Sequence, residues 1–350
     1  MKRLLLIYLM ICIALTIQAQ QTILVKKGDA QSLLDAIQQA NTTNADTKAP
    51  RLYILIPDGL YDLGERVLTP ITGHHIALIG QSMTGTIVRN APDRKIESIS
   101  KTAVFQNTGS DNYFQDMTLQ NALDYYAEDG DGRAVTLHDK GTRTICNRVR
   151  LLSHQDTYYS DNEDCQHYFQ DSEIHGTVDF ICGAGDVWFE NCRIVTEKRT
   201  KSGEGRCVIA APRTSKTQWG YVFNHCTIAN DVSRFEYARG WHTHPRCTML
   251  YTTLLTPEKL SKTRFDYRGM RTVQSDFKEY GTMDAQGRNI TPTSNVVTFT
   301  LKDEENPVET ILTNQEAKQF TVKRVFTAWN PDKQLNKIEQ TAQKLMKRLK

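Results

Sequence analysis

The sequence lacks several patterns that would place it in a common class of enzyme or binding protein. It has no GxSxG elbow, since GQSMTG at residues 80–85 has the wrong spacing, so a serine esterase is poorly supported. It has no CxxC pair, so a structural zinc knuckle has little support. The 43 basic residues barely exceed the 40 acidic ones, which argues against bulk nucleic-acid binding as the main role.

Long apolar runs are equally scarce. The one at residues 4–17, LLLIYLMICIALTI, follows the basic start MKR and precedes QAQ, a pattern typical of a secretory signal cleaved near Ala19. Its 14 residues are short for the alternative, a membrane anchor. We therefore expect residues 1–19 to be a signal peptide and the protein to be exported, whether secreted, periplasmic or on the cell surface.

The cysteine count fits no simple disulfide framework. Cleavage would remove Cys12 and leave seven cysteines, at positions 146, 165, 182, 192, 207, 226 and 247. An odd number means that at least one thiol stays unpaired in an export compartment. Several of these residues lie in apolar stretches, where a buried thiol acts as a small hydrophobe.

A short repeat runs along the middle of the chain. Five segments share an apolar or cysteine residue, a polar residue two positions later, and Leu or Ile five positions later: FQDMTL at 114, CNRVRL at 146, FQDSEI at 169, FENCRI at 189 and FNHCTI at 223. Their starts lie 32, 23, 20 and 34 residues apart, about the length of a β-helix coil of three short strands. Asn, Asp or His stands third in four of the five, as expected where a strand enters a turn. We predict an all-β fold, a single parallel β-helix over residues 20–331 with long side loops.

Two segments have helical spacing. Residues 30–41 place apolar side chains on one face, with Asp29 available as N-cap. Residues 332–349 do the same after the start signal NP. We expect a short N-terminal helix and a C-terminal amphipathic helix at 332–350, both as packing elements that cover the sheet edges at the ends of a coil stack.

Two aspartates, Asp156 and Asp179, occupy equivalent positions relative to the repeat. Asp156 lies ten residues after the repeat start at 146, and Asp179 lies ten after the start at 169. If these starts begin equivalent strands of successive coils, the two carboxyl groups stack on one face, with strands about 4.8 Å apart. Two carboxylates that close cannot both ionise comfortably, so one should keep its proton. The pair would then supply a nucleophile or base together with an acid.

At these residues the chain resembles a known enzyme family. The blocks QDTYY at 155–159, GTVDFICG at 176–183 and, more loosely, YARGW at 237–241 are similar to those of the pectin methylesterases. These carbohydrate esterases release methanol from methylated polygalacturonate. Weaker agreement covers most of the mature chain. The resemblance implies a single-stranded right-handed parallel β-helix of the pectin-lyase-like kind, in agreement with the repeat.

The resemblance also implies catalytic roles. Asp179 would attack the ester carbonyl and form a covalent acyl-enzyme. Asp156 would donate a proton to departing methanol and then take one from the hydrolytic water. Gln155 would donate a hydrogen bond to the developing oxyanion. Arg239 would hold Asp179 ionised and oriented through a charge-assisted hydrogen bond.

The same blocks imply which residues bind the substrate and which partners are expected. Trp241 would offer a flat apolar face to a sugar ring, and Tyr159 and Phe180 would also bind substrate. The implied partner is pectin, as methylated homogalacturonan, and no metal or organic cofactor is required. Nucleic acid is not an expected partner, no membrane span is expected after cleavage of the signal, and a monomer is expected.

The chain departs from the family pattern at four positions. Arg133 stands where a second oxyanion-binding Gln is usual, 22 residues before Gln155. Its guanidinium could donate to an oxyanion, or it could pair with Asp156 or Asp179 and favour the ionised carboxylate. The other three departures are Cys182 for an aromatic residue, Gly240 for proline and Leu63 for glutamate.

These departures leave alternatives open. One is a degenerate, non-catalytic protein that only binds pectin, and another is an esterase for a decorated pectic glycan. A pectate lyase or polygalacturonase on the same fold would need clustered calcium-binding acids or a separated acid pair, and the family blocks disfavour both.

Overall fold

The structure is a computed structural model that describes residues 21–347 except 128–131, 215, 231 and 268–275. The expected signal peptide, residues 1–19, lies outside the described residues, as do the last three residues of the expected C-terminal helix. Within the described ranges, no helix combines the length and the apolar character needed to span a membrane.

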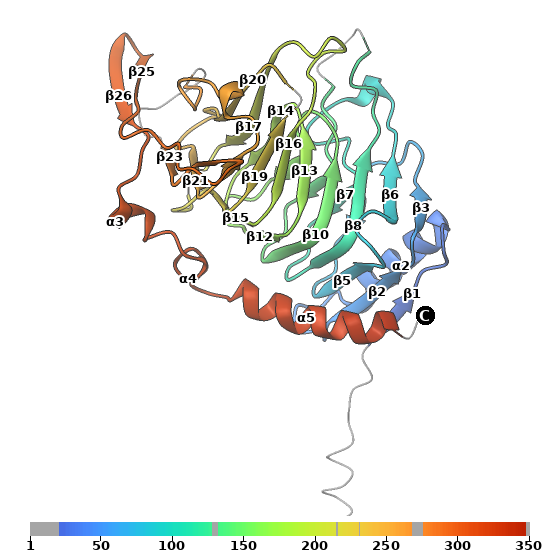
Figure 1. The fold of residues 1–350 in the computed structure, drawn as a ribbon. Helices are drawn as coiled ribbons and strands as arrows, with labels where there is room; N and C mark the ends of the chain where they lie inside the picture. The colour runs from blue at the N-terminus through green and yellow to red at the C-terminus, as the bar shows by residue number, and fades with distance from the viewer. Residues whose placement is uncertain (1–20, 128–131, 215, 231, 268–275, 348–350) are drawn as a thin grey trace, which may run out of the picture.

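The chain winds into a parallel β-helix whose coils contribute strands to a 17-stranded and a 7-stranded sheet (Figure 1). The 17-stranded sheet bends into two faces that β8 and β10 join, and these faces are called the first and second sheets; the 7-stranded sheet is called the third. Strands of one sheet pair in parallel from coil to coil. The first sheet contains β1 (Thr22–Leu24), β2 (Leu52–Ile56), β5 (Ile76–Gly80), β8 (Tyr113–Asn121), β10 (Thr144–Leu152), β12 (Gln166–Gln170), β15 (Asp186–Glu190), β18 (Tyr221–Asn224), β21 (Arg246–Leu250) and β23 (Asp276–Tyr280).

The second and third sheets complete each coil. The second contains β3 (Gly59–Asp62), β6 (Thr86–Asn90), the later halves of β8 and β10, β13 (Glu173–Gly176), β16 (Arg193–Thr196), β19 (Thr227–Asn230), β22 (Thr253–Leu254) and β24 (Met283–Asp284). The third contains β4 (Thr69–Ile71), β7 (Phe105–Asn107), β9 (Leu137–Asp139), β11 (Tyr158–Ser160), β14 (Val178–Gly183), β17 (Arg206–Pro212) and β20 (Arg234–Ala238).

Other elements lie outside the coils. They are helix α2 (Ala30–Thr43), the 3₁₀ turns η1 (Arg94–Ile96) and η2 (Pro257–Lys259), the antiparallel hairpin β25 (Val296–Leu301) and β26 (Glu304–Glu309), and helices α3 (Asn314–Ala317), α4 (Val322–Val325) and α5 (Pro331–Met346). The sequence did not predict the hairpin, α3 or α4. The two helices have only four residues each, too few for a periodic pattern.

The predicted repeat is confirmed by the register of the first sheet. Its five starts pair directly from strand to strand, in the order Phe114, Cys146, Phe169, Phe189 and Phe223. All five side chains are buried in the inner core. The ring centroids of Phe169 and Phe189 lie 5.0 Å apart and those of Phe189 and Phe223 4.5 Å apart. From Phe169 to Phe223, each coil thus stacks an aromatic ring on the one before.

The third position of each repeat marks the bend from the first sheet to the second. There the backbone takes φ values of 49–53°, in the left-handed region, at Asp116, Arg148, Asp171, Asn191 and His225. Asp and Asn enter this region more readily than most residues because their short polar side chains can hydrogen-bond locally. The prediction of a turn at this position is therefore confirmed, and Arg148 adopts the same conformation.

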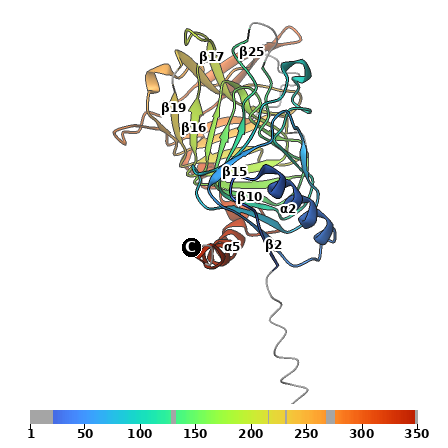
Figure 2. The same ribbon diagram turned by 90° about the vertical axis from the view of Figure 1, so that its right-hand side faces the viewer.

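Helix α2 forms where the sequence predicted a helix and covers the first coil (Figure 2). The Asp29 side chain accepts a hydrogen bond from the backbone N–H of Ser32 at 2.9 Å, which caps the helix. The buried face of α2, with Leu33 and Ile37, joins the inner core cluster. The apolar interior of the β-helix is thereby closed at this end.

Helix α5 also forms as predicted, but it covers a different surface. It lies along the outer face of the first sheet (Figure 1), not over the end of the coil stack. The reason is a row of large apolar side chains that point outward from successive strands. Leu335, Ile338 and Ala342 pack in one cluster with this row, which consists of Tyr53, Leu55, Ala77, Ile79, Tyr113, Ile145, Tyr168, Trp188, Val222 and Leu250.

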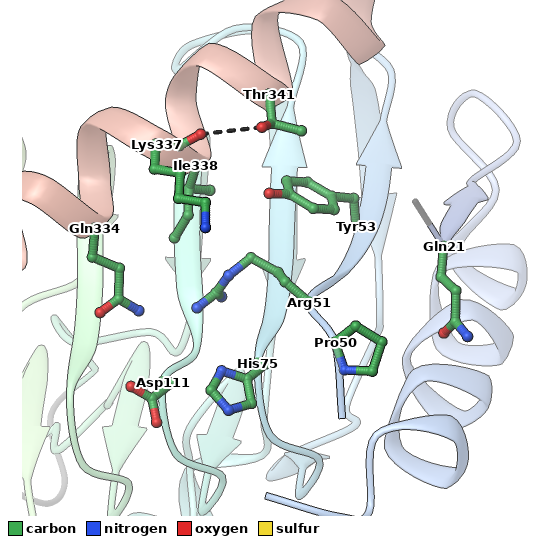
Figure 3. Close-up of a pocket in the computed structure, with 10 residues that line it drawn as sticks. All are labelled: Gln21, Pro50, Arg51, Tyr53, His75, Asp111, Gln334, Lys337, Ile338 and Thr341. Atoms are coloured by element: carbon green, nitrogen blue, oxygen red, sulfur yellow. Dashed lines mark hydrogen bonds between the residues drawn. The ribbon is translucent and has the colours of Figure 1, made fainter. Parts of the chain in front are cut away.

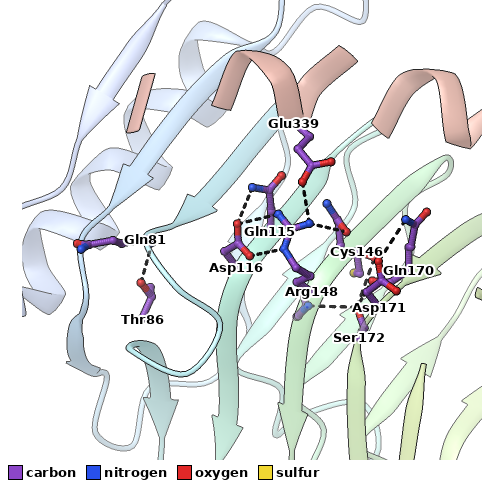
Figure 4. Close-up of polar contacts among 12 residues, drawn as sticks. Gln81, Thr86, Gln115, Asp116, Cys146, Arg148, Gln170, Asp171, Ser172 and Glu339 are labelled. Atoms are coloured by element: carbon purple, nitrogen blue, oxygen red, sulfur yellow. Dashed lines mark hydrogen bonds and ion pairs between the residues drawn. The ribbon is translucent and has the colours of Figure 1, made fainter. Parts of the chain in front are cut away.

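A polar contact ties α5 to the bend within β10 (Figure 4). Arg148 donates to Glu339 of α5 at 2.7 Å and to both carboxylate oxygens of Asp116 at 2.6 and 3.0 Å. These hydrogen bonds, to Asp116 first, raise the pKa of Arg148. The contact links two neighbouring bends and the helix through one guanidinium.

The cysteines are core residues in this fold. All seven from Cys146 to Cys247 are buried and have free thiols. Burial raises the pKa of most of them, including Cys146 and Cys165. Because the thiolate is the reactive form, these side chains act as small apolar groups.

The aromatic stack gives a test of the fold. We expect Phe189→Ala to lower the free energy of unfolding by about 3–5 kcal/mol, because it removes a ring packed between two others and leaves a cavity. Urea denaturation measures the change. Phe189→Leu, which keeps most of the volume, should lose clearly less, and equal losses for the two variants would contradict packing as the cause.

Candidate active site

The two acids occupy equivalent places in successive coils. Strand β11 pairs with β14 so that Tyr158 lies opposite Ile181, an offset of 23 residues. The Asp156 backbone N–H donates to the Val178 carbonyl at 3.4 Å, which continues this offset to Asp156 and Asp179. Both aspartates have left-handed backbones, with φ values of 60° and 52°. A bulge interrupts the pairing of β14 with β17 between Val178 and Ile181, next to Asp179. Such strained positions persist only where the surrounding structure fixes them, and they cluster at functional sites.

Arg239 binds both carboxylate oxygens of Asp179. Its Nε donates to Asp179 Oδ1 at 2.7 Å and its Nη2 donates to Oδ2, a two-pronged contact between planar groups. The segment that carries Arg239 is itself fixed, because its backbone N–H donates to Ala210 and the next N–H donates to Asp266. The hydrogen bonds to Asp179 raise the pKa of Arg239. The Asp179 side chain is thus held in one orientation beside a permanent positive charge.

Asp156 has a looser cationic neighbour. Arg133 Nε lies 3.9 Å from Asp156 Oδ2, and the Arg133 side chain is 40% exposed. A parallel bridge sets Arg133 beside Gln155. Of the two pairings that the sequence left open for Arg133, the structure has the one with Asp156. The two acids therefore differ in environment, since Arg239 donates two hydrogen bonds to Asp179 whereas Arg133 lies 3.9 Å from Asp156.

Cys182 stands on the same face as the acids. Its Sγ lies 3.9 Å from Asp156 Oδ1. Burial, and then the charges of Asp156 and Asp179, raise the pKa of the Cys182 thiol. The small side chain leaves room beside the acids that the aromatic residue usual in the resembling blocks would fill.

The site opens into a cavity of about 210 Å³. Its lining consists of Ile99, Arg133, Gln155, Asp156, Asp179, Cys182, Ala211, Arg239 and Trp241. Asp156 and Asp179 are 4% and 6% exposed, and both line this cavity. One wall is charged and the other, with Trp241, is apolar. The structure thus brings together six of the eight residues singled out in the sequence.

Tyr159 lies next to the cavity as a support for its apolar wall. Its ring centroid is 6.4 Å from that of Trp241, and the guanidinium carbon of Arg213 lies 5.9 Å from the Tyr159 centroid and 5.4 Å from the Trp241 centroid. Arg213 Nη2 and the Tyr159 hydroxyl both donate to Asp161, at 2.6 and 2.7 Å. No motif marks Arg213. It follows Pro212, which pairs with Gly183, and its backbone N–H donates to the Gly183 carbonyl at 2.7 Å.

The structure does not bring Phe180 into the site. Its side chain is fully buried in the inner core cluster, so the expectation that it binds substrate is corrected. Neighbouring residues of a strand point to opposite faces, and because Asp179 points outward, Phe180 points inward.

Comparison with known proteins assigns the chain to a family. The pectinesterase family model matches residues 22–328, and the chain belongs to this family. It is 28% identical over 235 residues to "Pectinesterase/pectinesterase inhibitor" of Ficus pumila var. awkeotsang, covering 64% of this chain and 40% of that protein. It is 27% identical over 237 residues to "Pectinesterase 3" of Solanum lycopersicum, covering 65% and 41%. The chain thus spans about four tenths of the length of these relatives.

Solved structures give the same fold. Pectin methylesterase PemA from Erwinia chrysanthemi superimposes with a TM-score of 0.69 at 22% identity, covering 89% of this chain and 98% of that chain. Pectin methylesterase from carrot gives 0.67 at 21% identity, covering 83% and 88%. The fold is the right-handed parallel β-helix of these enzymes, as predicted.

The ion pair between Asp179 and Arg239 can be tested without an activity assay. We expect Arg239→Gln to lower the free energy of unfolding by about 1–3 kcal/mol, because Asp179 keeps its charge and loses its partner. A double-mutant cycle with Asp179→Asn, followed by urea denaturation, should give a coupling free energy of about 0.5–3 kcal/mol. Additive losses would mean that the two side chains do not interact.

Proposed function

We propose that the protein is a pectinesterase that hydrolyses the C6 methyl esters of polygalacturonate, giving methanol and free carboxylates. The observation that carries the proposal is the bidentate pair of Asp179 with Arg239 beside Asp156, in a cavity walled by Trp241. This is a carboxylate held ready to react, next to a second carboxyl group in a different electrostatic setting.

In the proposed first half-reaction, one Asp179 oxygen attacks the ester carbonyl carbon. The carbonyl oxygen becomes an oxyanion, to which Gln155 donates a hydrogen bond and beside which Arg133 offers positive charge. Asp156 gives its proton to the leaving methoxy oxygen as the carbon–oxygen bond breaks. Methanol departs and an anhydride joins the sugar carbonyl to Asp179.

In the second half-reaction, the ionised Asp156 takes a proton from water as the water oxygen attacks the anhydride. The bond to Asp179 breaks, which restores its carboxylate, and the sugar leaves with a free carboxyl group. Arg239 stabilises Asp179 at both ends of the cycle, because the same two hydrogen bonds are available to the regenerated carboxylate. Every proton and bond is accounted for by these two acids and one water.

Substrate orientation is proposed to come from the cavity walls. Trp241 would stack on a sugar ring, with its own ring fixed by the Arg213 guanidinium and Tyr159 behind it. The room left by Cys182 and Ala211 could hold a substituent of a decorated pectic glycan. Export through cleavage of residues 1–19 and a monomeric state remain predictions from the sequence.

The role of Asp179 is tested by methanol release. We expect Asp179→Asn to lower the rate on highly methylated pectin by about 10³-fold or more, because an amide is a poor nucleophile. Asp62→Asn is a matched control, since Asp62 is also paired with an arginine, Arg89 of the next coil, but lies away from the cavity. A parent protein that binds pectin without releasing methanol would favour the non-catalytic alternative.

Arg133 gives a second test. We expect Arg133→Gln to keep or raise methanol release, because an amide can also donate to the oxyanion. The rate of methanol release from highly methylated pectin, compared between the two proteins, measures this. Complete loss of rate in a folded variant would show that the two donors are not interchangeable.

A further inference from the structure

A second cavity lies on another side of the molecule. It occupies about 640 Å³ between α5 and the first coils and is lined by Gln21, Pro50, Arg51, Tyr53, His75, Asp111, Gln334, Lys337, Ile338 and Thr341 (Figure 3). This volume is within the usual range for small-ligand sites. The acids of the candidate active site belong to the third sheet, whereas this cavity faces the first sheet and α5. Nothing in the proposed reaction uses it.

Arg51 is the unusual residue of this cavity. Its Nη1 is buried and has no hydrogen-bond partner, and within the described part of the chain its side chain makes no ion pair. Burial lowers the pKa of its guanidinium. A buried donor without a partner costs free energy, and a buried charge costs more. In Figure 3 the guanidinium points into the cavity, where a ligand could supply the missing acceptor.

The charges around the cavity favour an anion. Lys337 of α5 also points into it, so two cations face the same space (Figure 3). Asp111 is the acid that lines the cavity, and Arg143 already holds both of its carboxylate oxygens, at 2.8 and 2.6 Å. The arginine that neutralises Asp111 leaves the charges of Arg51 and Lys337 in excess.

The remaining lining suits a sugar. Gln334 of α5 presents an amide, and Thr341 presents a hydroxyl oxygen that can accept, since its proton is donated to the Lys337 carbonyl at 3.1 Å; Ile338 between them is apolar. His75 Nε2 contacts the carbonyl oxygen of Thr47 at 2.8 Å, so Nε2 carries a proton and Nδ1 remains as an acceptor in the neutral ring. Hydrogen-bonding groups beside an apolar surface are what a pyranose needs.

We propose that this cavity is a non-catalytic binding site for a uronic acid, with the carboxylate on the Arg51 guanidinium. The planar fork of arginine matches a carboxylate or a phosphate, and Lys337 adds a second positive charge. The choice of galacturonate as the probe rests on the proposed function, because it is the unit that ester hydrolysis would leave. Binding itself does not require catalysis, so the site and the reaction can be tested separately.

The experiment is calorimetric titration of the full chain carrying Asp179→Asn, which cannot turn over substrate under the proposed mechanism. Galacturonate should bind at one site that depends on Arg51. Its neutral methyl ester should bind at least about tenfold more weakly, because it loses the hydrogen bond between charged groups. Tenfold in affinity corresponds to about 1.4 kcal/mol, and a hydrogen bond to a charged group contributes up to about 3 kcal/mol. Adding Arg51→Gln should weaken galacturonate about tenfold or more. Lys333→Gln, on the exposed part of α5, is the matched control and should bind like its parent.

Other outcomes overturn the proposal. The proposal is wrong if galacturonate does not bind, or if inorganic phosphate binds in its place. It is also wrong if the Arg51→Gln protein binds galacturonate equally well, because the ligand would then lie in the active-site cavity.

Thermal melting without ligand separates a role of Arg51 in binding from a structural role. If Arg51 is kept for a ligand, Arg51→Gln should melt at the same or higher temperature than its parent, because a buried unpaired charge is removed. A large fall in melting temperature would assign Arg51 to the fold. Methanol release by the wild-type chain reports on the proposed function independently.

Discussion

The parallel hydrogen bonding of one coil to the next is the constraint on which the rest of the structure depends. It keeps equivalent residues in register, as the stack from Phe114 to Phe223 shows inside the core. The same register acts on the outer face, where it sets Asp156 beside Asp179. Core packing and site geometry are therefore two consequences of one pairing. A slip of one residue between β11 and β14 would disturb both.

The acids become chemically distinct through their neighbours. Asp179 is held by two hydrogen bonds from Arg239, whereas Arg133 Nε and Cys182 Sγ each lie 3.9 Å from an Asp156 carboxylate oxygen. This asymmetry is what a nucleophile and a proton donor need if they share one cavity. The asymmetry depends on which residues the coils and loops place beside the two aspartates.

The outer faces of the β-helix are used differently. The third sheet presents polar residues and Trp241 around the candidate active site. The first sheet presents a row of apolar side chains, which α5 and the segment with α3 and α4 cover, and a cavity beside α5 contains the Arg51 Nη1 that lacks a hydrogen-bond partner. One winding pattern thus produces two unlike cavities, because a different set of outward residues repeats on each face.

The sequence by itself determined the β-helix, its turn positions and the pairing of the acids, because all of these follow from a local repeat with a constant offset. The family blocks also pointed to Arg239, whose contact with Asp179 spans 60 residues. Only the tertiary structure decided that Phe180 points inward, that Arg213 supports Trp241, and that α5 lies along a sheet face. Those outcomes depend on strand bulges, side-chain direction and contacts between distant segments. A linear pattern does not encode such contacts.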